Sequence, residues 1–88
     1  MKLRGEFVVR QIMDSIVAIP VGQAALRLNG MILLNDVSKL IWDCLEKETD
    51  LENTVKAVTD AFDVSADEAR ADILEFCGKL SKLQLLEE

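Results

Sequence analysis

Residues 30–45 read GMILLNDVSKLIWDCL, and the repeat of apolar residues changes in the middle of this stretch. Residues 31–34 form a short continuous apolar run, as expected of a strand. After this run the apolar residues recur three and four positions apart, the period of one helical face: Val37, Leu40, Ile41, Cys44 and Leu45. Asn35 or Asp36 is placed to cap the first turn. The stretch therefore predicts a strand at 31–34 followed by a helix at 36–47.

The residues before this point favour β-structure. Residues 6–12 alternate loosely and residues 15–20 are almost wholly apolar, with only Met13-Asp14 between them. This pattern predicts a hairpin. Apolar residues also alternate with polar ones over residues 24–28, and Asn29-Gly30 follows. We therefore predict another strand at 24–28 that turns back onto 31–34 and occupies one side of it.

The residues after this point favour helices. Thr49 with Glu52, and Ser65 with Glu68, have the spacing of capping boxes, which predicts helices at about 50–62 and 66–83. Each is followed by apolar residues on one helical face: Leu51, Val55, Val58 and Phe62, then Ala69, Ile73, Phe76, Leu80 and Leu83. A chain with strands first and three helices afterwards belongs to the α+β class. We expect residues 1–88 to form one winged helix-turn-helix domain with an antiparallel sheet of three to four strands.

Length and composition limit where the protein can reside. The chain has 88 residues, half of them apolar, and its longest uninterrupted apolar runs are four or five residues. A helix that crosses a membrane needs about 20 consecutive apolar residues, so we expect no membrane association. Glu6 and Arg10 interrupt the hydrophobic region that a secretory signal would need. We therefore expect a cytoplasmic protein.

The side chains that most enzymes use are missing. The sequence contains no histidine and no tyrosine, and its glycines do not form a phosphate-binding loop. Cys44 and Cys77 make neither a disulfide framework nor a metal site, and we expect both in the core; a bridge between them would need their Cα atoms within about 7 Å. We predict a protein without catalytic residues, bound metal or cofactor.

The charge of the chain argues against nucleic acid as a partner. The formal net charge is −6, and residues 43–75 carry eleven acidic and three basic side chains. These acids are either the solvated face of helices or a docking site for a basic partner. A helix at 66–83 that entered a DNA groove would oppose the phosphates with Asp67, Glu68, Asp72 and Glu75 against Arg70, Lys79 and Lys82. Because phosphate contacts dominate DNA affinity, we expect no DNA binding.

Several stretches, taken in order, resemble the PqqD-like family, the peptide chaperones of pyrroloquinoline quinone biosynthesis and related recognition elements for ribosomally made, modified peptides. The matching stretches are 17–21, 30–36, Ile41-Trp42, Thr49 with Leu51 and Val55, 62–64, Asp72-Ile73 with Phe76, and Leu80, Leu83, Leu85 and Leu86. The sequence departs from the family where Asp-Gly usually follows the first helix, here Lys47-Glu48. It departs again where Gly often precedes the closing Leu pair, here Gln84.

The resemblance implies a peptide-binding function. It implies that an extended leader segment of a precursor peptide joins the third strand and lies against the third helix, and that the domain presents this peptide to a radical SAM or other modifying enzyme. Carried onto this sequence, the peptide-binding residues are Met31, Ile32, Leu33, Leu34, Ala69, Asp72, Ile73 and Phe76. Leu80 and Leu83 are expected in the interior, and plain core packing is the alternative for the helix residues.

Two other functions remain open at this point. We expect the protein to be a monomer. It could be a structural subunit that docks on an enzyme without touching its substrate. It could also be a DNA-binding winged-helix regulator, against which the charges argue. An experiment with the precursor peptide separates the first alternative from the chaperone function.

Overall fold

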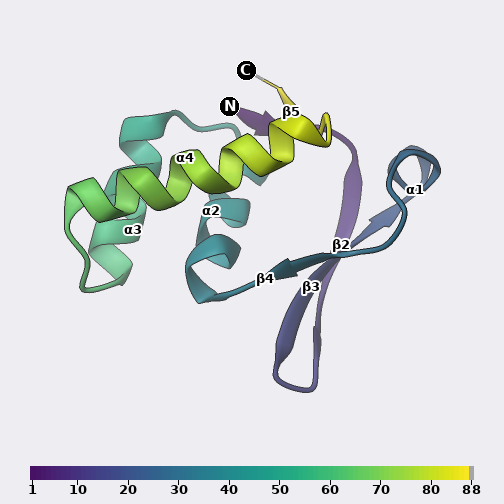
Figure 1. The fold of residues 1–88 in the computed structure, drawn as a ribbon, viewed down its shortest axis with the longest axis horizontal. Coiled ribbons are helices and arrows are strands. Elements are labelled where there is room, and N and C mark those ends of the chain that lie inside the picture. The colour runs from purple at the N-terminus through teal and green to yellow at the C-terminus, as the bar shows by residue number, and fades with distance from the viewer. Residues whose placement is uncertain (88) are drawn as a thin grey trace.

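A computed structural model describes residues 1–87 of the protein, and it has strands first and helices afterwards (Figure 1). The elements in chain order are β1 Lys2–Leu3, β2 Glu6–Ile12, β3 Ser15–Val21, α1 Gln23–Arg27, β4 Ile32–Leu34, α2 Asp36–Glu46, α3 Leu51–Ala61, α4 Ala66–Lys82 and β5 Leu86–Glu87. The predicted α+β class, a small antiparallel sheet followed by helices, is confirmed. The winged helix-turn-helix description stays a prediction. No helix within residues 1–87 is long and apolar enough to cross a membrane.

The main sheet has the strand order β2-β3-β4, and both pairings are antiparallel. Strands β2 and β3 form the hairpin around Met13-Asp14, with Ile12 opposite Ser15, and the far end of this hairpin projects away from the helices (Figure 1). Strand β4 pairs with the first half of β3, with Leu34 opposite Ile16 and Ile32 opposite Ala18. Strand β3 is therefore central, and β4 lies at an edge.

The strand predicted at 24–28 is wrong, because this segment forms the short helix α1. Ala24 and Leu28 are four residues apart and form a helical pair: the Leu28 N–H donates to the Ala24 carbonyl at 3.0 Å, and Ala24 is buried. Leu26, which alternation placed beside them, is 83% exposed. In so short a segment the helical and strand periods share most positions, so the sequence pattern could not separate them.

The three long helices begin at polar caps. At α2, the Asn35 side chain accepts from the Ser38 N–H and the Asn35 N–H donates to Ser38 Oγ, both at 2.8 Å, which makes a reciprocal capping box. At α4, Ser65 accepts from the Glu68 N–H at 3.1 Å, as predicted.

The cap predicted for the middle helix is one residue too early. Thr49 exchanges two backbone hydrogen bonds with Met1, at 2.6 and 2.8 Å, and is held in that pairing. The helix α3 therefore starts after Asp50, whose carboxylate accepts from the Asn53 N–H at 2.7 Å.

The two ends of the chain lie together, an arrangement that sequence analysis did not predict (Figure 1). Strands β1 and β5 pair antiparallel, with Leu3 opposite Leu86, and the Arg4 N–H donates to the Leu85 carbonyl at 2.8 Å. Each strand has only two residues, too few to carry a periodic pattern. Strand β1 contacts α2, and β5 contacts α4.

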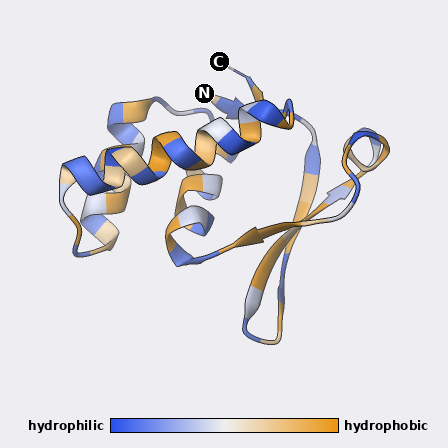
Figure 2. Ribbon diagram, viewed as in Figure 1, coloured by the Kyte–Doolittle hydropathy of each residue, from blue (hydrophilic) through white to orange (hydrophobic). Residues whose placement is uncertain are grey.

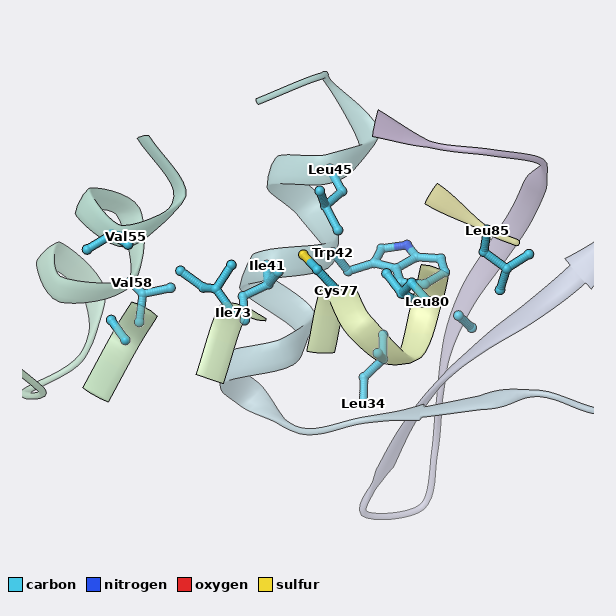
Figure 3. Close-up of a cluster of buried hydrophobic side chains, with 12 residues drawn as sticks. Leu34, Ile41, Trp42, Leu45, Val55, Val58, Ile73, Cys77, Leu80 and Leu85 are labelled. Atoms are coloured by element: carbon cyan, nitrogen blue, oxygen red, sulfur yellow. The ribbon is translucent and has the colours of Figure 1, made fainter. Parts of the chain in front are cut away.

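Most of the core lies among the helices α2, α3 and α4, and the sheet borders it with Ala18 and Leu34 (Figure 3). Trp42 at its centre is 1% exposed and meets the edge of Phe7 with ring centroids 5.0 Å apart, so the indole serves packing. Helix α4 contributes the buried residues Ala69, Ile73, Cys77 and Leu80.

Helices α2 and α4 are each followed by a residue with positive φ that is not glycine. These residues are Glu48, with φ of 64°, and Gln84, with φ of 60°. After α4, the Gln84 N–H donates to the Ser81 carbonyl and the Leu85 N–H donates to the Leu80 carbonyl, the bonding pattern of a Schellman motif. The departures from the family pattern thus fall on backbone positions that favour glycine.

Candidate functional site: a groove beside an open sheet edge

Strand β4 has a protein neighbour on one side only. It pairs with β3, and within residues 1–87 no strand lies along its other edge. The segment expected to turn back onto it forms α1, which contacts β2 and β3. An open edge presents backbone N–H and C=O groups that an added strand can satisfy.

A groove runs beside this open edge, between β4, the start of α2 and one face of α4. Its volume is about 580 Å³. Figure 2 shows that β4 is hydrophobic along its length, whereas α4 alternates between hydrophobic and hydrophilic residues. The lining residues are Met31, Ile32, Leu33, Leu34, Asn35, Val37, Ser38, Ile41, Asp72, Glu75, Phe76, Lys79, Leu80 and Leu83.

The groove combines an apolar floor with a polar rim. Ile41 and Leu80 are almost fully buried beneath it, and Phe76 is half-buried. Leu33 and Leu83 remain 70% and 47% exposed, which leaves apolar surface in contact with water. Covering such surface is favourable at about 25 cal/mol per Å². The groove therefore offers hydrophobic contacts next to unpaired backbone groups.

The structure brings six of the eight predicted peptide-binding residues to this groove, namely Met31, Ile32, Leu33, Leu34, Asp72 and Phe76. Ala69 and Ile73 do not line it, and both are completely buried in the core. The two sets belong to adjacent stripes of α4: residues 69, 73, 77 and 80 face the core, whereas 72, 76, 79 and 83 lie one position round the helix.

Sequence analysis missed part of the groove. Leu83, expected in the interior, is a half-exposed lining residue. The stripe that starts at Asp72 and Phe76 predicts Lys79 and Leu83 if it is continued at helical spacing. The remaining missed residues are Asn35, Val37, Ser38 and Ile41 on α2 and its N-cap, and Glu75 and Leu80 on α4. No sequence signal pointed to the α2 residues, because their place depends on how α2 packs beside β4.

Some charged side chains at or near the groove form ion pairs, and one carboxylate does not. Lys79 lies 3.7 Å from Glu75, Lys39 is 2.6 Å from Asp43, and Arg70 is 2.7 Å from Glu52. Asp72 takes part in none of the ion pairs formed within the described part of the chain. One end of the groove therefore carries a carboxylate without a cation.

The thiol that could be considered for chemistry is not activated. Burial, with a smaller contribution from Asp43, raises the pKa of the Cys44 thiol above its ordinary value, and Lys47 opposes the shift only in part. A raised pKa lowers the fraction of nucleophilic thiolate at neutral pH. Cys77 lies in the core, and within residues 1–87 no three His, Cys, Asp or Glu side chains are grouped to hold a metal ion.

The fold and the groove define a small α+β domain with an open-edged sheet beside an apolar helix face. Residues 20–86 match the family model described as Coenzyme PQQ synthesis protein D (PqqD). The chain therefore belongs to the PqqD family, and the resemblance seen in the sequence is confirmed.

A solved structure described as "TbiB1 in Complex with the TbiA(beta) Leader Peptide" is similar over nearly the whole length. Its sequence is 25% identical, its TM-score is 0.74, and the match covers 99% of this chain and 95% of that one. The similarity thus includes β1 and β2, which precede the family match. Among curated proteins, none matches this chain.

Proposed function

We propose that this protein is a non-catalytic chaperone that binds the leader segment of a ribosomally made precursor peptide. The leader adds as a strand to the open edge of β4 and places alternate side chains in the groove against α4. The protein then presents the remainder of the peptide to a separate modifying enzyme, of the radical SAM class or another peptide-modifying class, as membership of the PqqD family suggests.

One observation carries this proposal: an unpaired strand edge and an apolar helix face border the same groove. Backbone hydrogen bonds to an edge strand tolerate many sequences, and pockets for alternate side chains supply selectivity. TbiB1, which is similar over almost the whole chain, is described in complex with a leader peptide.

Two leucines, Leu74 on α4 and Leu83 at its C-cap, form a matched pair that tests the groove. Leu83 lines the groove and is 47% exposed, whereas Leu74 does not line it and is 54% exposed. Leu83→Gln should weaken binding about fivefold, because half of a leucine side chain buried by the guest contributes about 1 kcal/mol. Leu74→Gln should leave the affinity unchanged. The probe is the leader segment of the precursor peptide, and calorimetry measures its affinity.

The same measurement separates the chaperone from a structural subunit. If the protein binds the modifying enzyme but neither the wild-type chain nor Leu74→Gln binds the leader peptide, the chaperone function is wrong. Equal loss of affinity in the two leucine variants would show that the peptide binds elsewhere.

A further inference from the structure

Asp72 stands at the groove with no cation to balance it. Three cations on α2 and α4 already have carboxylate partners: Arg70 with Glu52, Lys79 with Glu75 and Lys39 with Asp43. Asp72 is exposed, lies on the groove-lining stripe of α4 and is absent from all of these pairs. A guest that buries the groove with a neutral or acidic side chain at this point would leave the carboxylate uncompensated.

The spacing of the stripe matches that of a strand. Asp72 and Phe76 are four residues apart, which is about 6 Å along a helix axis. Alternate side chains of a strand, which point to the same face, are about 6.7 Å apart. Consecutive inward side chains of an added strand therefore meet Asp72, then Phe76, then the apolar end formed by Leu80 and Leu83.

The direction of the guest fixes the order of these contacts. Strand β4 and helix α4 run in opposite directions across Figure 1. Antiparallel pairing is the more stable arrangement per residue, and a guest antiparallel to β4 runs in the same direction as α4. Its N-terminal inward residue then faces Asp72.

We propose that the groove selects peptides with a basic residue followed, two and four residues later, by large apolar residues. The inference rests on the proposed strand addition, and it specifies which side chains the bound peptide carries. Asp72 is the specificity-determining residue for the basic position, and Phe76 with Leu80 and Leu83 receives the two apolar positions.

Selection from random peptides displayed on phage tests this inference. Peptides enriched on the wild-type protein should carry Lys or Arg two residues before the first of two apolar residues that are themselves two apart. Selection on Asp72→Lys should remove the basic preference and keep the apolar pair. Enriched peptides with the apolar pair but no basic preference, or with a preference that Asp72→Lys leaves intact, overturn this inference alone. If Leu83→Gln enriches the same peptides as strongly as the wild type, the proposed function fails and this inference fails with it.

One enriched peptide and its Lys→Gln counterpart then complete a double-mutant cycle. Asp72→Asn should weaken the basic peptide about two- to fivefold, the range for an exposed ion pair, and should not affect the Gln peptide. Asp60→Asn is the matched control, because it removes the same charge from exposed surface of α3 outside the groove. An equal effect of both variants would mean that Asp72 acts only through net charge.

Discussion

Ile73 and Leu74 are neighbours in sequence with opposite surroundings. Ile73 is completely buried in the core, whereas Leu74 is 54% exposed on α4. Ile73→Ala should lower the free energy of unfolding by about 2–5 kcal/mol, because it removes buried apolar contacts and leaves a cavity. Leu74→Ala should change it by no more than about 0.5 kcal/mol. Urea denaturation of both variants measures the difference, and similar losses would contradict the orientation of α4.

The sequence predicted which helix borders the site, but it mixed residues from two adjacent faces of α4. The family resemblance pointed to Asp72 and Phe76, and both line the groove. It also assigned Ala69 and Ile73 to the peptide, although the core covers them fully. The amphipathic pattern shows which residues are apolar but not whether core or guest covers them.

Backbone conformation after α4 gives a prediction at the level of one element. Gln84 has φ of 60°, a conformation that costs a residue with a Cβ about 1 kcal/mol more than glycine. Gln84→Gly should therefore raise the free energy of unfolding by about 0.5–1 kcal/mol, with the entropy cost of glycine included. Ala71→Gly, at an exposed position inside α4, should lower it by about 1 kcal/mol. Thermal unfolding of the two glycine variants shows whether each raises or lowers the free energy of unfolding. If both lower it, α4 does not end in a left-handed residue at Gln84.

The elements with long periodic patterns could be predicted from the sequence. The short helix α1 and the two-residue strands β1 and β5 could not. Strands 6–12 and 15–20 and helices 36–47, 50–62 and 66–83 were expected, and the structure has them within about one residue at each end. The hairpin expected through Asn29-Gly30 is absent, because Ala24 and Leu28 pair along a helix. Strands β1 and β5 depend on contacts between the two ends of the chain, which local sequence does not encode.

At the scale of the whole molecule, charge gives a prediction about nucleic acid. The net charge is −6, and α4 carries both Asp67 and Glu68 in its first turn. Repulsion from phosphates should prevent binding even at low salt, where a DNA-binding protein shows its largest electrostatic affinity. A gel-shift assay with random-sequence duplex DNA at low ionic strength should show no complex. A DNA band shift that weakens as salt is added would support the DNA-binding alternative.

The sheet has two open edges, and this makes the central claim directly testable. Strand β2 forms one edge and β4 the other. An NMR titration of ¹⁵N-labelled protein with the leader peptide should move the amides of residues 31–34 and 72–83 and give contacts between peptide Hα protons and β4. Movement confined to Glu6–Ile12, or none in either edge while the peptide binds, would contradict strand addition at β4.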